Sequence, residues 1–123
     1  MGVSVRAVLE LRVATRAIEW AQATLGMTYA EVGTAVGVSE RTVSRWAQQS
    51  HPPRREHRDR IEKLNELRQL LTTVFGNDVA AAQEWMHEPV PLLRGRTPMS
   101  LVVKGELDDL IGLLAGLESG AFI

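Results

Sequence analysis

Apolar residues recur at spacings of three and four along the first 25 positions of the chain. This spacing is typical of an amphipathic helix that buries one face. Gly26 follows the last of them and predicts the end of that helix. Before the helix, Val3-Ser4-Val5 alternates and is compatible with an extended or a disordered start. The apolar stripe comprises Val8, Leu11, Ala14, Ile18, Ala21 and Leu25.

Capping and turn residues divide the next thirty positions into two short helices. Thr28 and Glu31 have the spacing of a capping box, so we expect a helix over 29–35 that is broken at Gly37. Ser39 is a suitable N-cap for another helix that runs to about residue 48. The turn at 51–53 follows, because neither of its two prolines can continue a helix.

The second half of the chain is also predicted to be helical. A longer helix ends at Gly76-Asn77, and its polar first turns, 54–60, would form a solvated extension. Asn77 would cap a helix over 78–87, and a loop over 92–96 would follow the prolines at 89 and 91. Thr97-Pro98 begins a short helix. A last helix runs from 106 to 118 with Gly120 as its C-cap, and no clear strand is visible.

Residues 29–48 resemble a helix-turn-helix at each spacing-sensitive position. Gly33 occupies the position where two helices approach closely, and Gly37 the turn position that favours positive φ. The alternative is a plain helical corner with a solvated arginine face. We therefore predict an all-α fold, in which an N-terminal helix-turn-helix bundle precedes a small helical C-terminal domain. The apolar positions are filled by Val32, Val36, Val38, Val43 and Trp46.

The second helix of this motif would carry the DNA contacts. Arg41 and Arg45 share one face, from which they could reach phosphates or a guanine edge. Six Arg stand against two acidic residues over 41–60, which favours a polyanionic partner. The predicted DNA-binding residues are Ser39, Glu40, Arg41, Thr42, Ser44, Arg45, Arg54 and Arg55.

The net charge of −1 is unevenly distributed. Residues 1–60 hold nine Arg against six acidic residues, and residues 61–123 hold five basic against nine acidic residues. This asymmetry indicates two surfaces for two kinds of partner. The chain has no cysteine, which excludes disulfide scaffolds, thiol nucleophiles and zinc ribbons. It has no signal-peptide pattern and no apolar run long enough for a membrane, so we expect a cytoplasmic protein.

No pattern indicates an enzyme. His51, His57 and His87 lack metal-ligand spacing and are expected to be solvated. There is no nucleophile elbow, and the neighbouring Asp108 and Asp109 would point about 100° apart on a helix. We predict no catalytic residue, no metal and no cofactor.

The C-terminal helix is apolar on nearly all sides, so it is either buried or covered by a partner. Gly112, Gly116 and Gly120 form one line that would allow close backbone approach. The apolar end of the chain, 121–123, could dock on its own core or insert into a partner. Trp85 is expected in the core. Arg94 and Arg96 are either protein contacts or solvated loop charges.

The order of residues in this half resembles the toxin-binding domain of Xre/MbcA/ParS-type antitoxins, and the likeness covers about residues 25–123. Residues 26–33 are also similar to the MbcA branch of that family. The residues that carry the resemblance are Trp85-Met86, Pro89, Leu92-Leu93, Gly95, Thr97-Pro98, Leu101 and Gly105-Glu106.

The resemblance implies a type II antitoxin that neutralises a RES-domain toxin, an enzyme that degrades NAD⁺, by covering its active-site cleft. It also implies possible repression of its own operon through operator DNA, and a homodimer or a hetero-oligomer with toxin. The alternative is a helix-turn-helix transcriptional regulator whose C-terminal half only dimerises or binds an effector. The domains would be 1–50 (helix-turn-helix), 51–76 (linker and connecting helix) and 77–123 (toxin-binding). Candidate toxin contacts are Arg94, Gly95, Arg96, Glu118, Ser119, Gly120, Ala121, Phe122 and Ile123.

Overall fold

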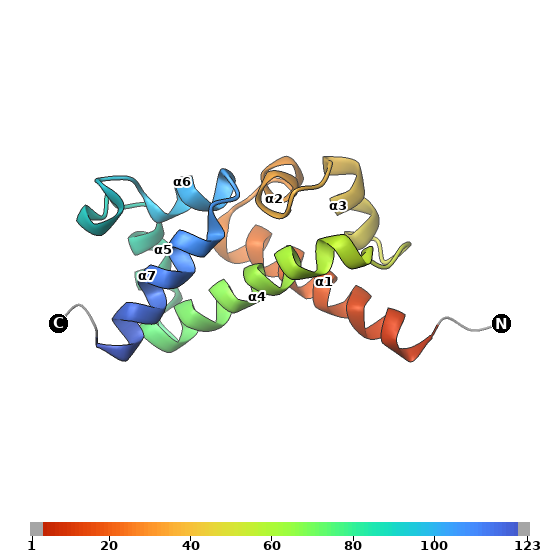
Figure 1. Ribbon diagram of the computed structural model, residues 1–123, viewed down its shortest axis with the longest axis horizontal. Helices are drawn as coiled ribbons and strands as arrows, with labels where there is room; N and C mark the ends of the chain where they lie inside the picture. The colour runs from red at the N-terminus through yellow and green to blue at the C-terminus, as the bar shows by residue number, and fades with distance from the viewer. Residues whose placement is uncertain (1–3, 121–123) are drawn as a thin grey trace. The chain divides into compact units, whose positions relative to one another are not determined.

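The computed structural model describes residues 4–120, and within them every regular element is a helix (Figure 1). The predicted all-α fold class is confirmed. Two compact units divide the chain, an N-terminal unit up to Glu62 and a C-terminal unit from Lys63, and α4 runs through the boundary. The elements are α1 (Val5–Leu25), α2 (Tyr29–Val36), α3 (Glu40–Ala47), α4 (Arg55–Phe75), α5 (Val79–Met86), a 3₁₀ turn η1 (Pro91–Leu93), α6 (Pro98–Val103) and α7 (Leu107–Ser119).

Local capping sets most helix ends, as the sequence predicted. The Thr28 hydroxyl accepts from the Glu31 amide, and the Glu31 carboxylate accepts from the Thr28 amide, which completes the capping box. Gly26, Gly37 and Gly120 each end a helix in the left-handed conformation.

Two helix starts differ from the prediction. The Ser4 hydroxyl accepts from the Ala7 amide, so α1 begins at Val5 and that residue is helical rather than extended or disordered. Val3 lies outside the described residues. The cap of α5 is Asp78 and not Asn77, because the Asp78 carboxylate is the group that accepts from the Ala81 amide.

The helix-turn-helix in the N-terminal unit consists of α2 and α3, and α1 packs against both. Gly33 lies where α2 meets the start of α3. A Cβ atom built there would be 2.6 Å from the Val38 carbonyl oxygen, so even one methyl group would collide with backbone. Glycine at this position therefore permits the close approach that the motif needs. Val32, Val36, Val43 and Trp46 are buried, as this motif requires.

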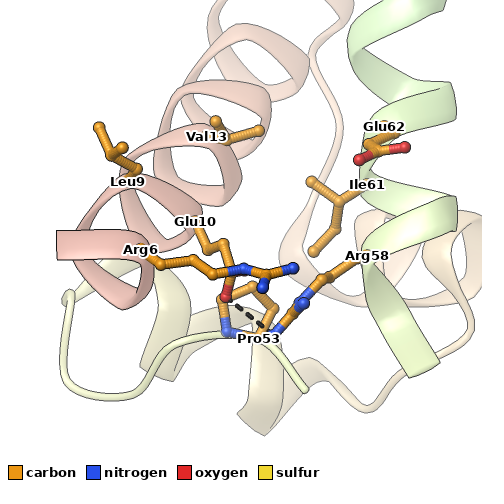
Figure 2. Close-up of a pocket in the computed structure, with 8 residues that line it drawn as sticks. All are labelled: Arg6, Leu9, Glu10, Val13, Pro53, Arg58, Ile61 and Glu62. Atoms are coloured by element: carbon orange, nitrogen blue, oxygen red, sulfur yellow. Dashed lines mark hydrogen bonds and ion pairs between the residues drawn. The ribbon is translucent and has the colours of Figure 1, made fainter. Parts of the chain in front are cut away.

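Within residues 54–60, only His57 and Arg58 are half-buried and the other five residues are exposed, so the predicted solvated extension is corrected at those two positions. Arg58 Nη2 lies 3.0 Å from Glu10 Oε2 on α1, and both side chains are half-buried. Arg6 Nε also pairs with Glu10, at 3.1 Å (Figure 2). Ile61, one turn further along α4, is buried. Although the sequence of this segment is polar, one of its residues forms an ion pair with another helix.

The C-terminal unit is built around a cluster of leucines. Leu93, Leu101 and Leu113 are buried together, and Trp85, Val90 and Leu117 pack against them. Trp85 is half-buried, and its ring centroid lies 5.7 Å from that of Phe75. The cluster joins η1, α6 and α7, and α6 packs on both α5 and α7.

The segment 92–96 was predicted to be a loop, but its first residues form the 3₁₀ turn η1. Val90 is the anchor of this segment: its amide donates to the Arg96 carbonyl, and its carbonyl accepts from the Gly95 amide, both at 3.0 Å. These bonds make 90–96 a closed turn.

Candidate functional site

The predicted DNA-contact residues of the helix-turn-helix share helix α3 and its N-cap. Glu40, Arg41 and Arg45 are exposed. Ser39 serves as N-cap by accepting from the Thr42 amide at 3.1 Å, and its Oγ lies 3.0 Å from Thr42 Oγ1. The Ser44 hydroxyl accepts from Gln48 Nε2. The hydroxyl groups are thus partly engaged within the helix, whereas the arginines extend into solvent.

The basic charge of this face is not neutralised locally. Among residues 4–120, no carboxylate pairs with Arg41, Arg45, Arg54 or Arg55. Arg54 lies beside Arg45 at the same surface hollow, whereas Arg55 is exposed on the first turn of α4. The face can therefore offer several guanidinium groups to a polyanion.

The second group of predicted contacts begins in the turn after η1. Arg94 and Gly95 both adopt positive φ, 60° and 79°, and both are exposed. Leu92, immediately before them, is 58% exposed although it is apolar. The closed turn therefore presents one apolar and one basic side chain to solvent.

Arg96, in contrast, is engaged within the chain. Its Nε donates to the Leu93 carbonyl at 3.0 Å, and its Nη1 donates to Glu106 Oε2 at 3.1 Å. It is half-buried and ties the turn to the residue that precedes α7. The sequence left Arg96 as either a protein contact or a solvated loop charge. The one signal in the sequence for this ion pair is the acidic residue Glu106, ten positions later.

The next three predicted contacts, Glu118, Ser119 and Gly120, lie at the end of α7. Glu118 and Ser119 are exposed, and Gly120 is the left-handed C-cap with φ 78°. Leu117 belongs to the same apolar cluster as Leu93, so the turn and the end of α7 are built on common packing. The predicted contacts Ala121, Phe122 and Ile123 lie outside the described residues.

The predicted close approach along the glycine line is not found at Gly112. This residue is exposed, and a Cβ built on it would meet no atom within 4 Å among the described residues. Gly120 serves as a cap rather than as a helix-interior residue.

His57 was expected to be solvated but is half-buried, with its ring centroid 6.1 Å from that of Trp46. His51 and His87 are exposed. Within 4–120, no three acidic or histidine side chains are grouped as a metal site would need. In the same range, no helix has the length and apolar character to cross a bilayer.

Comparisons with known proteins bear on both units. A model of the antitoxin Xre/MbcA/ParS C-terminal toxin-binding domain matches residues 70–120, and a homeodomain-like domain matches residues 9–51. The mycobacterial cidal antitoxin MbcA of Mycobacterium bovis is 35% identical over 99 residues, which are 80% of this chain and 86% of that protein. The chain belongs to the MbcA family of antitoxins.

Other members of the family match over a similar extent. MbcA of Mycobacterium tuberculosis gives the same 35% identity over 80% of this chain and 86% of its own length. A probable mycobacterial cidal antitoxin of that organism is 28% identical over 98 residues, 80% of this chain and 82% of its own. A chain in the crystal structure of the M. tuberculosis MbcT–MbcA toxin–antitoxin complex is 32% identical, with a TM-score of 0.63. That match covers 98% of this chain and 100% of the other.

Proposed function

We propose that this chain is the antitoxin of a type II toxin–antitoxin system and that it neutralises a NAD⁺-degrading RES-domain toxin by covering the toxin's active-site cleft. One observation carries the proposal. The chain resembles, over nearly its whole length and at 32% identity, a chain of a solved toxin–antitoxin complex. The curated relatives, named as cidal antitoxins, support the same role.

The inhibitory surface would lie on the C-terminal unit. Arg94 and Gly95 are exposed in the closed turn, and Glu118 and Ser119 are exposed where α7 ends. Both places rest on the cluster of Leu93 and Leu117, so this surface would need little reordering on binding. Arg96 would act by holding the turn, through its bonds to Leu93 and Glu106.

Deleting residues 121–123 tests the contribution of the apolar end. Gly120 and the whole of α7 remain, so thermal unfolding of the chain should be unchanged. Inhibition of the toxin should weaken, because burying Phe122 or Ile123 in a cleft would contribute about 1.5–3 kcal/mol each. That loss corresponds to at least a tenfold weaker inhibition constant. Full inhibition by the shortened chain would contradict insertion of this end into the cleft.

The helix-turn-helix would bind operator DNA and repress the operon of the pair. Arg41 and Arg45 on the exposed face of α3 support this part, because they have no carboxylate partner among the described residues. The competing proposal, a transcriptional regulator that binds no toxin, has less support. It leaves the match to the toxin-binding domain over 70–120 without a role.

A second copy of the chain would dock on the outer face of α1. Val5, Val8, Leu9 and Val13 are exposed there, within the first nine residues of the helix. Beside them is a hollow of about 220 Å³ between α1 and the start of α4 (Figure 2). An apolar ridge next to a hollow is the self-complementary pattern that a two-fold interface requires.

The charges around this hollow also favour a copy of the same chain. Arg6 and Arg58 are balanced there by Glu10 and Glu62, so two such faces would not repel each other. A strongly basic or acidic partner would find no opposite net charge. A homodimer would place two copies of α3 against two half-sites of an operator.

A further inference from the structure

Side chains from α3, from the connection after it and from α4 surround a hollow of about 350 Å³ on the N-terminal unit. Among residues 4–120, no carboxylate lines this hollow, although two arginines, two histidines and a threonine do. It adjoins the face of α3 that was predicted to bind DNA, but neither histidine was part of that prediction. The side chains that matter here are Thr42, Arg45, Trp46, His51, Arg54 and His57.

The connection that forms one wall of the hollow is held in place by hydrogen bonds. The Ser50 amide and hydroxyl both donate to the Arg45 carbonyl at 3.0 Å, and the Gln49 amide donates to the Trp46 carbonyl. Gln49 adopts φ 56°, a conformation that few non-glycine residues take, so the chain turns sharply here. These bonds set where His51 lies relative to α3.

The floor and the opposite wall are also fixed. Trp46 is only 3% exposed, and its carbonyl accepts from the Thr15 hydroxyl on α1 at 3.1 Å. The His57 ring packs beside the Trp46 indole. The hollow is therefore formed before any ligand arrives, which lowers the entropic cost of binding.

Every polar side chain at the hollow can donate hydrogen bonds. The guanidinium groups of Arg45 and Arg54 carry five N–H donors each and have no carboxylate partner among residues 4–120. An imidazole carries at least one N–H in either protonation state, and Thr42 has a hydroxyl. Outside the lining, Glu56 approaches one of these side chains, with its Oε1 3.5 Å from His57 Nε2. These donors and the two guanidinium charges favour an anion with several acceptor oxygens.

We propose that this hollow binds one phosphate group of a nucleic-acid backbone, with Arg45, Arg54, His51 and His57 donating to its oxygens. The proposal rests on the proposed DNA binding by α3 and adds a distinct site to it. Contacts to phosphate fix the register of a protein on a duplex, whereas base contacts specify sequence. The hollow would thus set how α3 enters the groove of the duplex. Arg41 would remain available to contact the edges of the bases there.

The test compares two arginine variants by their salt dependence. The probe is a duplex from the region upstream of the chain's own gene, and log Kobs is measured against log salt concentration. Arg54→Ala removes one donor of the hollow from an exposed position, so the fold should survive. We expect the slope to become shallower, by at most about 0.9, because Arg45 still contacts the same phosphate. Arg54→Lys keeps the charge and should keep the slope.

Arg16→Ala is the matched control, because Arg16 is an exposed arginine of the same unit that does not line the hollow. It should leave the slope unchanged. His57→Gln should also weaken binding to the upstream duplex and to an unrelated duplex by the same factor, as a backbone contact predicts. DNA binding by the wild type with an Arg54→Ala slope equal to that of Arg16→Ala would overturn the proposal.

A titration with inorganic phosphate distinguishes a failure of this proposal from a failure of the proposed DNA binding by α3. In NMR titration of the wild-type chain, phosphate should shift the imidazole signals of His51 and His57 and the indole signal of Trp46. The DNA duplex should compete with it. Phosphate shifts without any DNA binding would refute the backbone assignment and leave a site for free phosphate. DNA binding without phosphate shifts at these three residues would refute the hollow as the site.

Discussion

The glycines of this chain show that surroundings, not residue type, decide what a residue does. Gly33 is buried between two helices, with backbone atoms closer to its missing Cβ than any side chain could tolerate. Gly112 is also inside a helix, but it faces open space. The sequence placed both in helices and suggested close packing for both. The roles of the two glycines can be distinguished only from the atoms that surround each of them in the folded chain.

Alanine at these two positions should change stability in opposite directions. Gly33→Ala should lower the free energy of unfolding by about 1–3 kcal/mol, because the clash with the Val38 carbonyl outweighs the better helix propensity. Gly112→Ala should raise it by about 0.5–1 kcal/mol, because an exposed helix-interior glycine gains propensity without a clash. Urea unfolding of both variants measures this. Equal changes would contradict the packing described at Gly33.

The arginines also differ by their surroundings: some are held in ion pairs and others face solvent. Arg58 and Arg96 hold Glu10 and Glu106, whereas Arg41 and Arg45 have no carboxylate partner among the described residues. The Arg58 pair was not predictable, because its partner lies 48 positions away on another helix. Charge density alone therefore did not show that Arg58, unlike its neighbours Arg54 and Arg55, is half-buried in an ion pair.

At the scale of the helices, local signals were sufficient where the determining contact is local. The capping box at Thr28, the cap at Ser39 and the proline start at Pro98 involve bonds over three or four residues, and each is present. The prediction of Asn77 as the cap was wrong: the cap is Asp78, and because both residue types are good caps, only geometry selects one. The turn η1 was missed because its bonds depend on Val90 and Arg96.

DNA binding by helix α3 should be separable from inhibition of the toxin. Arg41→Ala with Arg45→Ala removes two exposed charges, so binding to the upstream duplex should weaken by at least tenfold. The salt slope should also become shallower, because Arg45 no longer contacts the phosphate in the hollow. Inhibition of the toxin should not change. Electrophoretic mobility shift at several salt concentrations, together with the toxin assay, measures both. Unchanged DNA binding, or a joint loss of both activities, would contradict this division.

Helix α1 should carry the dimer interface. Leu9→Asp places a charge on its outer face, and Leu92→Asp makes the same change on the C-terminal unit at a leucine of nearly equal exposure, 55% against 58%. In sedimentation velocity, wild type and Leu92→Asp should have twice the 13.6 kDa chain mass, and Leu9→Asp the single mass. A dimer that survives Leu9→Asp, or a monomeric wild type, would contradict the proposed interface.

At the scale of the whole molecule, the two units divide the charge and, in the proposal, the function. Up to Glu62 the chain holds nine basic against seven acidic residues, and from Lys63 five against eight. The sequence predicted this asymmetry and the family. It could not show which residues of the C-terminal unit face outward, because that depends on the hydrogen bonds within 90–96 and on the packing of Leu93 against Leu101 and Leu113.

The most direct test of the proposed antitoxin role follows cellular NAD⁺. The reading frame adjacent to the gene of this chain is expressed in a bacterial host, alone and together with the chain, and NAD⁺ is measured over time. We predict that NAD⁺ collapses when the neighbour is expressed alone and is preserved by co-expression. NAD⁺ that stays constant in both cases, or that collapses despite an excess of this chain, would contradict the proposal.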